Sequence, residues 1–175
     1  TGHTAIHRYT FTGKEKPRLM IDFQSVVAGS EEKLFKHVLD AKVNCESHSV
    51  ISGFTKAIVW LECSYLNLIE FSIPFVTKVL LPRQKDSERA LRYVFSFNLK
   101  SVQVLVVKIA VSSTDINGAL KNLLSEIKDW DFNRLKNEVK SLWDNYISRV
   151  KIDGGKQQKD IYYTSMSHLF IQHNN

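Results

Sequence analysis

The sequence predicts a mainly β fold that gives way to helices towards the C-terminus. Up to residue 111, apolar and polar residues alternate in several short segments, which is the period-2 pattern of half-buried strands. From residue 115 the apolar residues recur at helical spacing, and one apolar stripe covers residues 132–150 over about five turns. Strands followed by helices are typical of an all-β unit that leads into a helical part.

The N-terminal segments predict a β-hairpin. Apolar and polar residues alternate over residues 5–11, and residues 13–17, which contain a glycine and a proline, interrupt the alternation. The pattern resumes over residues 18–23. Two alternating runs separated by a short break with glycine are typical of two paired strands.

Further strands are predicted at short intervals. They cover residues 49–52, 57–63, 65–73, 91–97 and 102–111. The last is the richest in valine and isoleucine and carries apolar residues on both sides, so we expect it in the interior of a sheet. Residues 82–88 are predicted to be a surface loop.

A first helix is predicted over residues 115–127. Its apolar positions are Ala119, Leu120, Leu123, Leu124 and Ile127. Ser113 or Thr114 can cap its start, since a side-chain oxygen there can accept a hydrogen bond from a free backbone N–H group.

A second helix is predicted to follow Asp131, its expected N-cap, and to end at Gly154-Gly155. Its apolar stripe consists of Phe132, Leu135, Val139, Leu142, Trp143, Tyr146, Ile147 and Val150. A further helix is expected over residues 160–170. Unless the stripe folds back onto the sheet, it exposes apolar surface and predicts self-association.

The net charge is +6, from 24 Lys and Arg against 18 Asp and Glu, and the isoelectric point is near 9.3. The basic residues are scattered and interrupted by acids, so no Lys/Arg stripe lies on one predicted face. This pattern favours solvated loops over a phosphate-binding surface, and we expect no nucleic-acid partner. No apolar run reaches the length of a membrane span.

The two cysteines, Cys45 and Cys63, can form one disulfide or remain free, and buried free thiols are favoured. They do not have metal-binding spacing. Because the sequence opens Thr1-Gly2-His3 rather than with methionine, we expect a processed or excised piece.

No complete active site is apparent in the sequence. It contains no glycine-rich phosphate loop, nucleophile elbow or zinc-type histidine pair, so no catalytic residue and no metal ligand is assigned. His7 and His168 are expected to be structural. Glycosidase chemistry needs two carboxyl groups that face each other across a sugar. The candidates Asp22, Asp40, Glu62 and Glu70 lie in or beside strands, where exposed polar positions are the favoured interpretation.

Trp60 is the one candidate substrate-binding residue. It lies in the apolar run Ile-Val-Trp-Leu, which favours packing in the core over stacking on a sugar face. Trp130 and Trp143 lie in the helical part and are predicted to pack it onto neighbouring elements.

The helical part of the chain contains a series of distinctive strings. They are GALKNLLSEI at 118–127, WDF at 130–132, LW at 142–143, VKIDGG at 150–155, IYYT at 161–164, and SHL at 167–169 with Asn174. Upstream lie HRYTF at 7–11, ISGF at 51–54, Trp60 and EFSIPF at 70–75. In order and spacing, these strings resemble glycoside hydrolase family 92, the calcium-dependent exo-acting α-mannosidases, over most of the chain.

The resemblance implies a β-sandwich of the galactose-mutarotase type, a helical linker and the start of an (α/α)6 barrel. The expected domains are a partial sandwich over residues 1–112, a linker over 113–153 and the truncated start of the catalytic domain over 154–175. The family's general acid, general base and most calcium ligands come from the barrel, which would follow Asn175. Calcium is therefore implied for the whole enzyme and not for this chain. The implied location is extracytoplasmic, secreted or periplasmic.

Three departures from the family pattern bear on the site. Val59 stands where the family tends to have glycine, residues 54–57 lack an arginine-rich run, and Ser167 replaces a usual tyrosine. These changes favour a divergent or inactive homologue and weaken a sugar-contacting role for Trp60.

The leading hypothesis is a fragment of an α-mannosidase, for example an α-1,2-mannosidase, that acts on mannose-containing glycans. Its expected partner is the missing barrel domain. The alternative is a non-catalytic sandwich module that binds carbohydrate or a protein.

Overall fold

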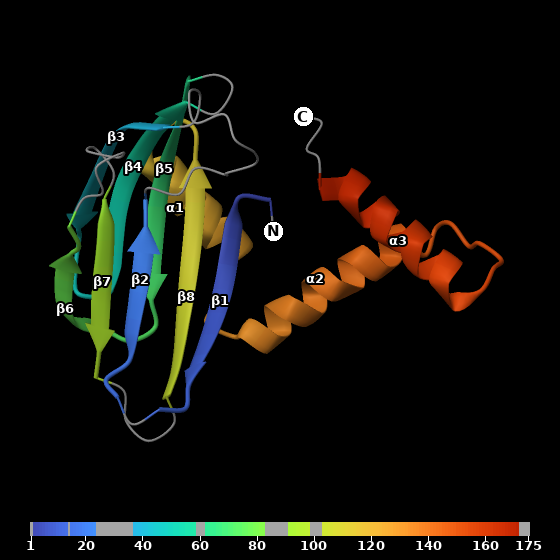
Figure 1. The fold of residues 1–175 in the computed structure, drawn as a ribbon, viewed down its shortest axis with the longest axis horizontal. Helices are drawn as coiled ribbons and strands as arrows, with labels where there is room; N and C mark the ends of the chain where they lie inside the picture. The colour runs from blue at the N-terminus through green and yellow to red at the C-terminus, as the bar shows by residue number, and fades with distance from the viewer. Residues whose placement is uncertain are drawn as a thin grey trace. The chain divides into compact units, whose positions relative to one another are not determined.

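The computed structural model describes residues 2–13, 15–23, 37–58, 62–82, 91–98 and 103–171. The chain divides into two compact units, Thr1–Phe132 and Asn133–Asn175. The first is a β-sandwich with one helix on its outer face, and the second is helical. The predicted mainly β fold with C-terminal helices is therefore confirmed (Figure 1).

The larger sheet of the sandwich has five antiparallel strands in the order β1-β8-β5-β4-β3. Their bounds are β1 Thr4–Phe11, β8 Gln103–Ser112, β5 Glu62–Phe71, β4 Val50–Ile58 and β3 His37–Cys45. The smaller sheet has three antiparallel strands in the order β2-β7-β6. Their bounds are β2 Arg18–Asp22, β7 Arg92–Phe97 and β6 Phe75–Leu80.

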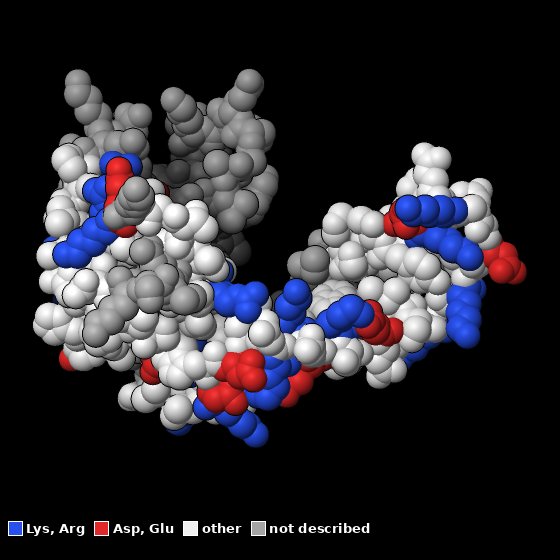
Figure 2. All heavy atoms as spheres, turned by 90° about the horizontal axis from the view of Figure 1, so that it is seen from below, with Lys and Arg blue, Asp and Glu red and all other residues white. Residues whose placement is uncertain are grey.

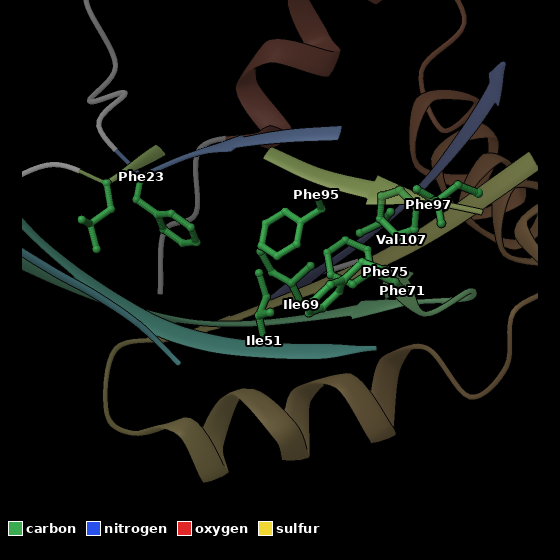
Figure 3. Packing of buried hydrophobic residues seen from close by; sticks show 10 residues of the cluster. Phe23, Ile51, Ile69, Phe71, Phe75, Phe95, Phe97 and Val107 are labelled. Carbon is green, nitrogen blue, oxygen red and sulfur yellow. The ribbon is translucent and has the colours of Figure 1, made fainter. Parts of the chain in front are cut away.

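The main core lies between the facing sides of the two sheets, and aromatic rings fill its centre (Figure 3). Phe95 and Phe97 of β7 are fully buried, and Phe71 of β5 is 2% exposed. The ring centroids of Phe95 and Phe75 lie 5.0 Å apart, and those of Phe95 and Phe71 lie 5.4 Å apart. Rings at these separations gain attraction beyond the burial of their area, so this cluster joins the two sheets.

Helix α1, Ile116–Glu126, covers the face of the five-stranded sheet that points away from this core (Figure 3). Its Ala119, Leu123 and the following Ile127 are at most 2% exposed. Strand β8 therefore has apolar neighbours on both sides. Leu105 belongs to the inter-sheet core, whereas Ala110, on the opposite face by strand alternation, is fully buried on the helix side. The predicted interior position of β8 is confirmed.

The second unit contains most of α2, Phe132–Ile147, and all of α3, Lys156–Ile171. Residues 148–155 connect the helices, and the hydroxyl of Tyr163 donates a hydrogen bond to the backbone oxygen of Val150 at 3.3 Å. Helix α2 begins directly after Asp131, as predicted, but it ends at Ile147 and not at Gly154-Gly155. Helix α3 begins at Lys156, four residues before the predicted start at Asp160.

The predicted N-terminal hairpin is wrong. Strand β1 pairs with β8, as in Tyr9 with Leu105, whereas β2 pairs with β7, as in Leu19 with Phe95. The interruption between β1 and β2 carries the chain from one sheet to the other. Alternation identified both strands correctly, but it contains no information about which strand lies alongside.

The predicted strand over residues 57–63 is also wrong. Strand β4 ends at Ile58, strand β5 begins at Glu62, and these two residues are register partners. One apolar run therefore spans the ends of two paired strands. Strands β3 and β6 were not predicted, because β3 includes Asp40, Lys42 and Asn44 and β6 has five exposed residues out of six.

Two local predictions need correction. The N-cap of α1 is Asp115 rather than Ser113 or Thr114, because Oδ1 of Asp115 accepts a hydrogen bond from the Gly118 N–H at 2.5 Å. The hydroxyl of Thr114 instead contacts that of Ser112 at 3.0 Å.

Cys45 is free and exposed rather than buried, because it ends the edge strand β3. The side chain of Cys63 is not among those described.

We predict that replacing Gly53 on β4 by alanine destabilises the sandwich. A Cβ atom there would lie 2.4 Å from the backbone oxygen of Lys42 on β3, so the two strands would have to separate. We expect Gly53→Ala to lower the free energy of unfolding by about 1–3 kcal/mol, measured by urea denaturation. At Gly13 the nearest atom to a Cβ is 3.8 Å away, so Gly13→Ala is the matched control. Equal stability of both variants would contradict the prediction.

Two adjacent leucines of α1 test which side of the helix packs against the sheet. Leu123 is 1% exposed and Leu124 is 65% exposed. We expect Leu123→Ala to lower the free energy of unfolding by about 2–5 kcal/mol, because it leaves a cavity between helix and sheet. Leu124→Ala should change it by no more than about 0.5 kcal/mol. Thermal unfolding followed by circular dichroism distinguishes the two, and a reversed order would show that the helix packs through its other side.

Candidate functional site

The predicted sugar-contacting residue, Trp60, falls outside the residues that the structure describes, and so does the side chain of Glu62. The flanking Ile58 and Glu62 face each other at one end of the β4–β5 ladder. A role for Trp60 in stacking on a sugar therefore remains a prediction.

The other candidate carboxylates do not form a pair. Asp40 and Glu70 lie in the same sheet, but their partners on β4, Lys56 and Val50, are six residues apart. Six residues of strand separate the two carboxylates by about 20 Å, whereas inverting glycosidases hold theirs roughly 6.5–9.5 Å apart. Asp22 belongs to the other sheet. Asp40 and Glu70 therefore cannot act as a glycosidase pair.

Two histidines near the N-terminus have local structural contacts, and no contact is described for His168. Nδ1 of His3 lies 2.9 Å from Oε1 of Glu126, and this contact joins the start of β1 to the end of α1. His7 stacks on Tyr9 with ring centroids 6.0 Å apart, and His168 is exposed on α3. Among the described residues, no three His, Cys, Asp or Glu side chains lie close enough to hold a metal ion.

Basic and acidic side chains are interspersed on the face drawn in Figure 2, and the coloured residues there do not form a continuous basic surface. This arrangement agrees with the scattering of Lys and Arg along the sequence. None of the described helices is both long and apolar enough to cross a membrane.

The junction between strands and helices is the most closely fitted part of the outer face. Gly118 leaves no room for a side chain, since a Cβ atom would lie 2.6 Å from Oγ of Ser112 and 2.9 Å from Oγ1 of Thr114. The side-chain amide of Asn122 donates to the backbone oxygen of Val111 at 2.9 Å. These contacts connect α1 to the end of β8 and fix where the helix begins.

This junction opens the segment that matches a family model. Residues 118–175 match the model described as the glycosyl hydrolase family 92 catalytic domain. For this segment, the predicted resemblance to family 92 is confirmed. The matching segment begins at Gly118, inside α1, although α1 packs on the sandwich and the compact unit continues to Phe132. The family 92 match and the packing therefore divide the chain at different places, and the predicted boundaries at residues 112 and 153 remain predictions.

Solved family 92 structures have the same fold as this chain. A GH92 inverting mannosidase from Bacteroides thetaiotaomicron superposes with a TM-score of 0.75 and 16% sequence identity, over 95% of this chain and 22% of that one. A second GH92 glycosyl hydrolase superposes with a TM-score of 0.72 and 16% identity, over 93% of this chain and 22% of that one. This chain thus spans about a fifth of their length. A comparison with curated protein sequences finds no match.

Sequence reasoning missed two basic residues on the outer face of the five-stranded sheet, Lys108 and Arg8. Lys108 is the only charged residue of β8 and is 6% exposed, with its Nζ 3.8 Å from Oε2 of Glu70. Arg8 lies on the neighbouring strand β1. The signal in the sequence was Lys108, the single charged residue in the apolar run of β8. Its role could not be predicted, because its partners Glu70 and Trp130 are distant in the sequence.

The apolar stripe of α2 yields a prediction about association. Leu142 is 54% exposed, Tyr146 40% and the following Val150 39%. We expect the chain to self-associate, so that its weight-average mass in sedimentation equilibrium rises above 20.2 kDa with concentration. Leu142→Gln should reduce this rise, and Asn137→Gln on the same helix should not. A monomer at every concentration would contradict the prediction.

Proposed function

We propose that this chain is the sandwich and junction of an α-mannosidase of the family 92 type that acts on mannose-containing glycans. The match of residues 118–175 to a catalytic-domain model is the observation that carries the proposal. The shared fold of the sandwich with an inverting mannosidase supports it. The chain would supply one wall of the sugar pocket and a rigid surface for the barrel domain, but not the catalytic carboxylates.

The reaction proposed for the whole enzyme is hydrolysis of an α-mannosidic bond, for example an α-1,2 linkage, with inversion. One carboxylic acid protonates the leaving oxygen while a second carboxylate, on the opposite face of the ring, activates a water molecule. Both groups would come from the barrel. The wide separation of Asp40 and Glu70 along β4 supports this assignment, because neither can serve as the other's partner.

Calcium is proposed only as a property of the whole enzyme. Such a cation requires about six to eight oxygen ligands, and the described residues contain no cluster of acidic side chains that fits it. We therefore assign no residue of this chain to the metal. An extracytoplasmic location, secreted or periplasmic, is proposed from the family resemblance alone.

The first test is the intact mass of the protein from its natural source, followed by an assay. A mass several times the 20.2 kDa of this chain is expected. That protein should release mannose from α-1,2-mannobiose, and removal of calcium with a chelator should abolish the release. The isolated 175-residue chain should release none. Activity in the isolated chain would refute the assignment of the catalytic carboxylates to the barrel.

A natural protein near 20.2 kDa with no activity would instead favour the binding-module alternative. Trp60→Ala then separates the two roles of that residue. Weaker binding to a mannan in a domain that keeps its melting temperature would assign Trp60 to the glycan, and loss of the fold would assign it to the core.

A further inference from the structure

Lys108 is a buried cation on the outer face of the five-stranded sheet, where it holds an aromatic ring. Its side chain is 8% exposed, and Nζ lies 4.1 Å from the centre of the Trp130 ring and 3.8 Å from Oε2 of Glu70. Burial of an ammonium group is costly unless nearby groups replace the water. The ring face and the carboxylate supply that replacement, so Lys108 and Trp130 stabilise each other.

A second cation–ring contact lies beside the first. The guanidinium carbon of Arg8 is 4.6 Å from the centre of the Phe132 ring. Arg8 faces Val106 across the β1–β8 ladder, and Val106 and Lys108 point to the same side of β8 because they are two residues apart. The two cations are therefore diagonal neighbours on one face of the sheet. Their rings belong to residues 130 and 132, which are also two apart in sequence.

The segment between α1 and α2 is buried at its start, where Ile127 is 2% exposed, and contacts these two cations at its end. Trp130 is 38% exposed, and its contact with Lys108 agrees with the prediction that it packs the helical part onto a neighbouring element. The backbone N–H of Asp131 donates to Oδ1 of Asp129 at 2.9 Å and shapes the turn that presents the rings. All of these groups lie in the unit Thr1–Phe132.

We propose that Lys108 and Arg8 form a two-point latch that holds residues 130–132 on the sandwich, with Lys108 as the principal positioning residue. The latch sets the point on the sandwich from which α2 leaves. The inference that this point positions a catalytic domain rests on the proposed function. The latch itself is a property of this chain and can be tested without any enzymatic activity.

The test uses the full chain with Trp60→Phe and Trp143→Phe, which leave Trp130 as the single fluorescent reporter. Lys108→Met keeps the length of the side chain and removes its charge. We expect acrylamide to quench Trp130 more strongly in this variant, and trypsin to cleave after the exposed Lys128 roughly 5- to 30-fold faster. Lys108→Arg, which keeps the cation, should restore values close to those of the parent.

Lys78→Met is the matched control, because Nζ of Lys78 lies 4.5 Å from the centre of the Tyr93 ring on the other sheet. It should change neither readout at the junction. Circular dichroism establishes that each variant is folded. A folded Lys108→Met chain with unchanged quenching and unchanged cleavage after Lys128 would overturn the latch.

If Lys108→Met does not fold, the variant Trp130→Leu tests the latch instead. It removes the ring and leaves Lys108 paired with Glu70, so cleavage after Lys128 should still accelerate in a folded sandwich. Unchanged cleavage would overturn the proposal. Absence of mannosidase activity in the natural protein would refute the proposed function and leave both of these outcomes unaffected.

Discussion

The structure of the sandwich depends on strand β8 being covered on both faces. Leu105 and Val107 face the aromatic cluster between the sheets, and Ala110 lies on the side that α1 covers. A strand with apolar residues on both faces is unstable with one face in water. Helix α1 is therefore a structural part of the sandwich, although the catalytic-domain model of family 92 includes most of it.

The same face of β8 explains the one buried charge of the strand. On the outer face, Lys108 and Arg8 lie among apolar residues such as Ile6 and Val106. Lysine and arginine can lay their stems along the sheet while their charged ends contact Trp130 and Phe132. Residues 130 and 132 therefore contact the sheet through cations, whereas the two sheets contact each other through aromatic rings.

The topology of the five-stranded sheet keeps Asp40 and Glu70 apart. Asp40 and Glu70 are both on the five-stranded sheet, but they occupy opposite ends of the β4 ladder. Catalysis by two carboxylates requires both groups to face one sugar ring. Asp40 and Glu70 do not meet this requirement, because six residues of β4 separate their register partners.

Much of the secondary structure could be predicted from the sequence, because it depends on local periodicity. The alternation in β1 and β2, the β-branched run in β8 and the helical stripes of α1 and α2 were recognised correctly. Strand β6 was missed because five of its six residues are exposed, so its periodicity is weak. Strand β3 was missed although residues 40–44 alternate, because this edge strand carries charged or polar residues at every second position. The predicted strand over residues 57–63 is wrong because Ile58 and Glu62 are register partners on two different strands, and apolar composition does not record where one strand ends and the next begins.

The sequence by itself determined the class of fold, the change from strands to helices near residue 112, and the resemblance of the junction to family 92. Only the tertiary structure decided which strands pair, that β1 and β2 belong to different sheets, and that Lys108 contacts Trp130. The physical reason is that periodicity records which side of an element is buried. The identity of the neighbour depends on contacts between residues far apart in the chain, and a single sequence does not record those contacts.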